Sequence, residues 1–239
     1  MANVASLPQP RGLIASVGHT VGLVLIMLAL CLGGAYQQSR SGTNQDLVPV
    51  HRGLVPLYLS VIGGEWALVL YVRAGTRRTG TRLRDLIGGR WRGVKDVLRD
   101  VAIAAVFWPV WVGVGWLVHL ALGPNQAKSI AVLLPRGPLE ILLWIFVSIS
   151  AAVCEELVFR GYLQKQLSQI TGSGIVAVAG QAIVFGMGHG YQGAKQVVII
   201  IALGASFGFL ALWRKSLRPG MLAHAWADIF SGILEGRWR

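Results

Sequence analysis

The sequence predicts an all-α fold, a polytopic bundle of about seven transmembrane helices. Of its 239 residues 54% are hydrophobic and only 13% are charged, whereas a soluble domain carries about a quarter charged residues. The apolar residues gather in blocks long enough to cross a bilayer core of about 30 Å. These blocks are continuously apolar, and a β-barrel would instead need alternating apolar and polar residues.

The apolar blocks define the predicted spans and the division of the chain. The spans cover residues 13–36, 53–72, 100–122, 139–169, 174–190, 195–213 and 219–235. The first block is longer than the apolar core of a signal peptide, about 7–15 residues, so we interpret it as an uncleaved span. We expect two parts: residues 1–138, with N-terminal helices and a basic loop at 73–99, and residues 139–239, which hold the candidate site.

The positive charge is concentrated in one connection. The formal net charge is +12, and much of it lies in the loop between Arg73 and Arg99. A short basic loop between apolar blocks indicates the cytoplasmic side, and it can contact anionic lipid headgroups. Aromatic residues are sparse in this loop, which argues against nucleic acid as a partner. We expect a multi-pass protein of the plasma membrane of a prokaryotic cell.

The cytoplasmic loop fixes a predicted topology. The N-terminus, the turn at 171–174 and the basic residues at 214–218 fall on the same side as the loop, and the connections 37–52 and 123–138 fall outside. Arg237 and Arg239 also fall outside, against the positive-inside rule.

The fourth span ends in an unusual group of charges. Glu155, Glu156 and Arg160 follow an almost uninterrupted apolar run, where each charge costs about 2.5–3.5 kcal/mol. Glu156 and Arg160 are four residues apart and can pair on one helix face. Glu155 points about 100° away, so its partners must come from other helices.

Two further spans carry candidate partners for Glu155. Phe185 and His189 are one helical turn apart in the fifth span, and His224 and Asp228 are one turn apart in the seventh. Glu155 and His189 lie equally far along the chain from the turn at Gly172, so two helical arms at about 1.5 Å per residue bring them to one level. The sequence therefore predicts a shared hydrated cavity.

Two kinds of chemistry suit these residues. A carboxylate beside imidazoles can deprotonate water and stabilise the oxyanion that results. Alternatively, Glu155, His189 and His224 supply the ligand types of a hydrolytic zinc, although the HExxH spacing of many zinc proteases is absent. The cofactor is accordingly either none or a single divalent metal such as zinc. Both routes predict hydrolysis of an amide within the membrane.

Three motifs resemble those of one membrane-protein family. They read Glu155-Glu156-x-x-x-Arg160, Phe185-x-x-x-His189 and His224-x-x-x-Asp228. In this order, on the fourth, fifth and seventh predicted spans, they resemble the CPBP family of intramembrane endopeptidases, which includes the type II CAAX prenyl proteases and bacteriocin-processing proteins. The resemblance covers about residues 139–235. It implies a glutamate- or metal-dependent endopeptidase with its catalytic cavity among the four C-terminal helices.

The resemblance also implies roles for individual residues. Glu155 would activate water with help from His189, while His224 and Asp228 would stabilise the oxyanion. Glu156, Arg160 and Phe185 would brace the site. The family also has Asn at the last motif position, an amide that can donate a hydrogen bond. Asp228 accepts only when ionised, so we hypothesise that it keeps His224 protonated as the donor. Metal ligation by Asp228 is the competing account.

Substrate and activity leave alternatives open. The substrate would be a peptide or a membrane-associated protein, and the resemblance does not specify whether it is prenylated. A catalytically silent scaffold or immunity factor of the same fold is the main alternative. A proton-coupled transporter is a third reading, weakened by the absence of clear repeats and the small number of spans.

Overall fold

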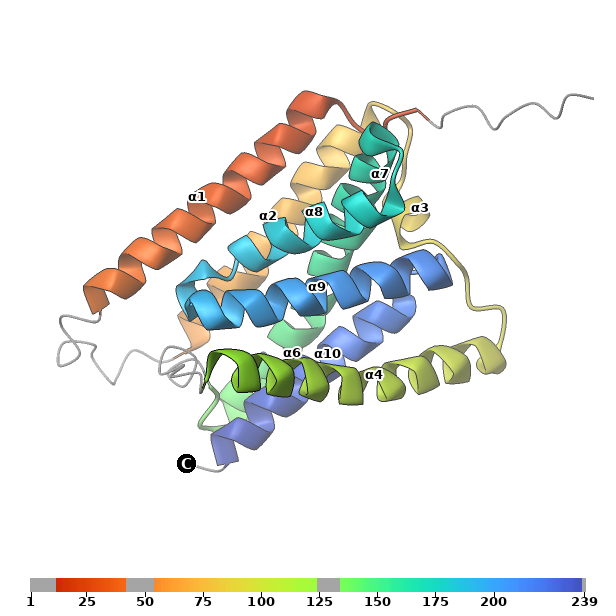
Figure 1. Cartoon of the computed structure of the whole chain (residues 1–239). Helices are drawn as coiled ribbons and strands as arrows, with labels where there is room; N and C mark the ends of the chain where they lie inside the picture. The colour runs from red at the N-terminus through yellow and green to blue at the C-terminus, as the bar shows by residue number, and fades with distance from the viewer. Residues whose placement is uncertain (1–11, 42–53, 124–133, 238–239) are drawn as a thin grey trace, which may run out of the picture.

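The computed structural model is an all-α bundle (Figure 1) and describes residues 12–41, 54–123 and 134–237. Within these ranges there is no strand, and Gly88 and Ser216 form an isolated bridge. The helices are α1 (Val17–Ser41), α2 (Val55–Arg77), α3 (Leu83–Ile87), α4 (Val94–Leu122), α6 (Pro138–Glu155), the π-helix η2 (Glu156–Gln164), α7 (Lys165–Thr171), α8 (Gly174–Met187), the 3₁₀ turn η3 (Gly190–Gln192), α9 (Ala194–Arg214) and α10 (Arg218–Arg237).

The prediction of a polytopic all-α protein is confirmed, and each predicted span contains a helix. Five helical segments are long and apolar enough to cross a membrane: Val17–Tyr36, Val55–Arg77, Val94–Ala121, Pro138–Thr171 and Ala194–Arg214. The fifth predicted span is shorter than expected, because α8 ends at Met187. Most of the predicted outer connections and Arg239 lie outside the described residues.

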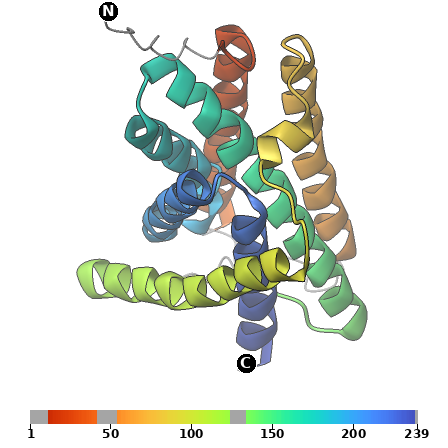
Figure 2. The ribbon, with the colours of Figure 1, turned by 90° about the vertical axis from the view of Figure 1, so that its right-hand side faces the viewer.

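The main hydrophobic core gathers around η2, with buried residues from α1, α2 and α8, and α6 and α10 pack together beside it. The last helix, α10, packs against α6 and α4, while α2 packs against α6 and α8 against α9. Figure 2 shows α4 crossing α10 at the side of the molecule away from α2. Three elements distant in sequence, α2, α6 and α10, are thereby brought together at the centre.

The basic connection is structured and lies at one end of the bundle. Lys165 of α7 donates to the carbonyls of Asp85 and Leu86 in α3, and the Leu217 N–H donates to the Ile87 carbonyl. The start of the chain joins the same end, where Gln166 donates to the Ala15 carbonyl. The N-terminal side, the basic segment, α7 and the α9–α10 turn therefore share one side, as the predicted topology requires.

The π-helix η2 replaces the continuous α-helix that the sequence predicts for the fourth span. All of its residues are buried, and it contacts α2, α3, α8 and α9. Two of its polar side chains are directed at α9: Arg160 donates to the Gly204 carbonyl and Gln164 to the Gly208 carbonyl. π-Helical segments are frequent at functional sites, and this one begins at the paired glutamates.

Glycines allow α9 to approach these side chains closely. A Cβ atom at Gly208 would lie 2.8 Å from both Gln164 Oε1 and Gln181 Nε2. At Gly204 it would lie 3.0 Å from Phe185 Cδ1. The Gly204–Gly208 pair thus acts as a small-xxx-small surface, which holds α9 against η2 and α8.

Candidate active site

Glu155 and His224 meet between α6 and α10. The Nε2 atom of His224 lies 3.5 Å from Glu155 Oε2, and the two side chains are 6% and 20% exposed respectively. Glu155 is the last residue of α6, directly before the π-helix. The glutamate that lacks a partner on its own helix is therefore directed at an imidazole in the protein interior.

Asp228 belongs to the same group. Its Oδ2 atom lies 3.5 Å from the same His224 nitrogen, one helical turn further along α10. The backbone carbonyl of Asp228 accepts a hydrogen bond of 2.9 Å from Trp144 Nε1 of α6, which joins the two helices at this level. One imidazole nitrogen thus lies between two carboxylates from different helices.

Glu156 and Arg160 form the predicted ion pair. Arg160 Nη1 lies 3.0 Å from Glu156 Oε1, and both side chains are almost fully buried. Glu156 Oε1 is also 3.5 Å from His224 Nδ1, so the pair supports the imidazole from its other side. A Cβ atom at Gly220 of α10 would lie 3.1 Å from Glu156 Oε2, so the glycine leaves room for this close approach.

Phe185 connects the buried arginine to both histidines. The Arg160 guanidinium lies over the Phe185 ring at 4.3 Å from its centroid, a favourable cation–π geometry. The Phe185 ring packs edge-on against His189 at 4.9 Å and His224 at 6.3 Å between centroids. Phe185, from the second motif, therefore packs between Arg160 of the first motif and His224 of the third.

His189 lies just beyond the end of α8 and starts the turn η3. Its Nδ1 atom is 3.0 Å from the Phe185 carbonyl, and its ring stacks on Tyr191. A carbonyl can only accept, so Nδ1 carries a proton and Nε2 remains the variable nitrogen. His189 interacts electrostatically with Asp228, whereas its direct contacts are with Phe185 and Tyr191 rather than with Glu155.

The structure adds one carboxylate that the sequence interpretation missed. Glu65 of α2 is hydrogen-bonded to Ser150 of α6 and interacts electrostatically with Glu155, Asp228 and His224. Its Oε2 atom is buried without a hydrogen-bond partner among the described residues. The signal was available, because Glu65 is an acidic residue inside an apolar span, but it belongs to no motif.

The candidate zinc ligands do not form a ligand set in this arrangement. Within residues 12–41, 54–123 and 134–237, no group of three or more His, Cys, Asp or Glu side chains has a geometry that could hold a metal ion. Glu155 and His224 are adjacent, whereas the direct contacts of His189 are with Phe185 and Tyr191. We therefore derive no catalytic step through a metal.

The fold and this group of residues define an integral membrane helix bundle with buried carboxylates facing imidazoles. Residues 137–230 match the family model described as "Rce1-like: Type II CAAX prenyl endopeptidase Rce1-like". The match contains all three motifs and confirms the resemblance drawn from them. This segment is therefore similar to type II CAAX prenyl endopeptidases, and Glu65 lies outside it. No curated protein and no solved structure matches the chain.

Proposed function

We propose that the protein is an intramembrane endopeptidase that hydrolyses a peptide bond of a membrane-associated protein or peptide. The observation that carries the proposal is the approach of Glu155 to His224 inside a segment that matches CAAX proteases. A charged pair in the membrane interior is costly unless it is used or compensated. We further propose that the protein works in the plasma membrane of a prokaryotic cell.

Glu155 is the proposed general base. Its carboxylate takes a proton from a water molecule, and the oxygen of that water forms a bond to the carbonyl carbon of the substrate. The carbonyl π electrons move to the oxygen, giving a tetrahedral oxyanion. The proton then passes from Glu155 to the amide nitrogen, the C–N bond breaks, and a carboxylic acid and an amine are released.

The two histidines have separate roles in this proposal. His224 lies between Glu155 and Asp228, whose negative charges favour its protonated form, so it can stabilise the oxyanion. His189, with Nδ1 held by the Phe185 carbonyl, assists Glu155 in positioning the water through Nε2. Glu156 and Arg160 hold His224 from the opposite side.

The test compares membranes from cells that express the wild-type protein, Glu155→Gln or Glu140→Gln. Glu140 is a matched control because it lies on the same helix, where it accepts hydrogen bonds from the backbone N–H groups of Arg136 and Gly137 at the helix start. We expect precursor proteins to accumulate only with Glu155→Gln, as detected by proteomic comparison of intact and cleaved chains.

Two other outcomes would replace this proposal. Identical protein patterns in all three membranes would favour a silent scaffold or immunity factor. Loss of proton-coupled flux in Glu155→Gln vesicles, with no accumulated precursor, would favour a transporter.

A further inference from the structure

An apolar groove runs between α4 and α9 on the outside of the bundle. It has a volume of about 560 Å³ and is lined along α4 by a row that includes Ala102 and Phe107, and along α9 by a row that includes Phe209 and Trp213. This volume is in the range of small-molecule sites, about 300–1,000 Å³. Both helices are long and apolar enough to span the membrane, so the groove faces the acyl chains of the bilayer.

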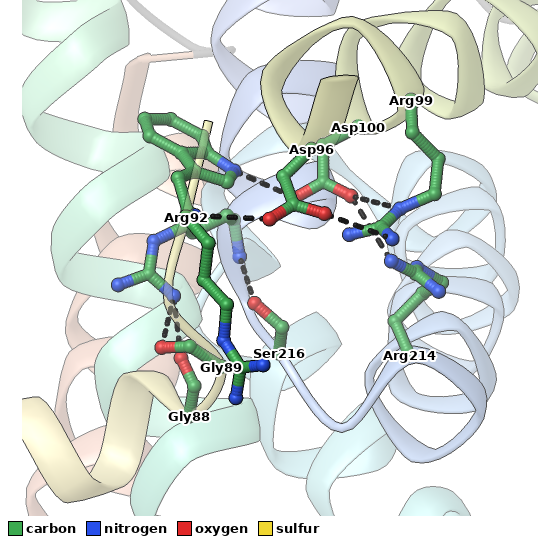
Figure 3. A network of polar contacts seen from close by, with 10 residues as sticks. Gly88, Gly89, Arg92, Asp96, Arg99, Asp100, Arg214 and Ser216 are labelled. Carbon is green, nitrogen blue, oxygen red and sulfur yellow. Dashed lines mark hydrogen bonds and ion pairs between the residues drawn. The ribbon is translucent and has the colours of Figure 1, made fainter. Parts of the chain in front are cut away.

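One end of the groove is charged. Among the described residues that line the groove, Arg99 is the charged one. Figure 3 shows that Arg99 belongs to a polar network in which the Asp100 carboxylate also binds Arg214. Asp96 pairs with Arg99 at 3.1 Å. This end of the groove is the end of the bundle that carries the basic segment.

The network has more positive than negative groups. Asp96 and Asp100 pair with Arg99 and Arg214, while Arg92 joins through its backbone N–H, which donates to Asp96 (Figure 3). Arg218 joins through the Gly88 and Gly89 carbonyls and lies over the Trp91 ring. The Nε atom of Arg214 is buried but has no hydrogen-bond partner among the described residues. Because Arg92 and Arg218 add positive charge beyond the two Asp–Arg pairs, an anion at this end of the groove would meet a net positive field.

We propose that this groove binds an anionic phospholipid, with one acyl chain between α4 and α9 and the phosphate beside Arg99 and Arg214. The apolar lining suits a lipid acyl chain, and the excess of arginine over aspartate side chains suits a negatively charged headgroup. Trp213, 68% exposed at the same end, is a residue type typical of the membrane interface. The site is separate from Glu155 and does not depend on proteolysis.

The experiment is native mass spectrometry of the full-length protein in detergent. The protein is equilibrated with equal amounts of phosphatidylglycerol and phosphatidylcholine that carry identical acyl chains. Ala102→Trp fills the groove, whereas Ala105→Trp places the same side chain on an exposed position of α4 outside the lining. Arg99→Gln removes the charge at the groove, and Arg84→Gln removes a charge from the basic segment, where the Arg84 side chain is 70% exposed.

We expect the wild-type protein, Ala105→Trp and Arg84→Gln to retain phosphatidylglycerol in preference to phosphatidylcholine. Ala102→Trp should lower phosphatidylglycerol occupancy roughly tenfold, equivalent to about 1.4 kcal/mol, and Arg99→Gln should abolish the preference. Equal retention by Ala102→Trp and Ala105→Trp would overturn the proposal, as would equal retention of the two lipids by the wild-type protein. If Arg99→Gln does not fold, the two tryptophan variants still decide the question.

Discussion

A single imidazole, that of His224, lies within 3.5 Å of carboxylate oxygens from Glu155, Glu156 and Asp228. Buried charges are tolerated only where opposite charges compensate them, and here Arg160 supplies a positive partner 3.0 Å from Glu156. Removing one partner would leave an uncompensated charge in the membrane interior. This explains why the charged residues of three motifs are found as a connected group rather than singly.

Glu65 is predicted to be a positioning residue for this group. Glu65→Gln keeps the side-chain shape and a partner for Ser150 but removes a carboxyl that interacts with Glu155. Because it acts through Glu155, we expect kcat to fall about tenfold with KM unchanged, less than the 10²–10⁴-fold loss typical of removing a general base. The measurement is cleavage of an identified substrate by the purified variants.

Glu140→Gln serves as the control for this measurement, since Glu140 lies at the start of α6. A variant Glu65→Gln with wild-type kcat would show that Glu65 has no role in positioning. A variant Glu65→Asp that recovers part of the rate would support the carboxyl group, rather than side-chain volume, as the cause.

The residues of the candidate site could be predicted to the extent that they lie in short motifs. Glu156 and Arg160 pair as their spacing indicated, and His224 and Asp228 lie together on α10. The contact of His224, rather than His189, with Glu155 depends on how α10 packs against α6. Glu65 was missed because its neighbours along the chain are apolar, and only the packing of α2 on α6 brings it to the site.

At the level of the helices, the sequence predicted where apolar segments lie but not how each one is wound. The run from Pro138 to Thr171 is continuous, yet residues 156–164 form a π-helix. Hydropathy does not distinguish π from α turns, because it reports side-chain polarity and the two turns differ in their backbone hydrogen bonds. The end of α8 at Met187 has a clearer cause, since Gly188 caps the helix and Gly190 follows closely, and glycine disfavours continuation of a helix.

Close packing of α9 against η2 leads to a prediction about stability. A methyl group at Gly208 would lie 2.8 Å from polar atoms of Gln164 and Gln181, so Gly208→Ala forces these buried side chains to move. Overpacking of this kind costs about 1–3 kcal/mol. We expect a lower midpoint of thermal unfolding in detergent for Gly208→Ala than for the wild-type protein.

Gly113→Ala on α4 provides the matched control, because a Cβ atom there would have no neighbour within 4 Å. The higher helix propensity of alanine should leave that variant as stable as the wild-type protein or more stable. If the two substitutions had the same effect, close contact at Gly208 would not limit the stability of the bundle.

For the whole molecule, the positive-inside pattern predicts which end faces the cytoplasm. The basic segment, α7 and the α9–α10 turn meet at one end, and that end is expected to be cytoplasmic. A single cysteine introduced as Arg84→Cys, in a background with Cys31→Ser and Cys154→Ser, should react with a membrane-impermeant maleimide only after the cells are opened. Labelling in intact cells would show the opposite orientation.

The N-terminal helices also belong to the site, although they carry none of the three motifs. Residues 137–230 match the family model, but α2 packs on α6 and supplies Glu65. A sequence comparison alone would assign the chemistry to the C-terminal part. The structure shows that the first part of the chain contributes a carboxylate to the same group.

The central place of α10 has a consequence for biogenesis. Of the three helices that carry Glu65, Glu155 and His224, α2 is synthesised first, α6 follows, and α10 comes last. Until that helix inserts, Glu65 and Glu155 lack His224 and remain unfavourable in lipid. A nascent chain that stalls before α10 would therefore expose acidic residues within the bilayer, the kind of defect by which membrane quality control recognises unfinished proteins for degradation.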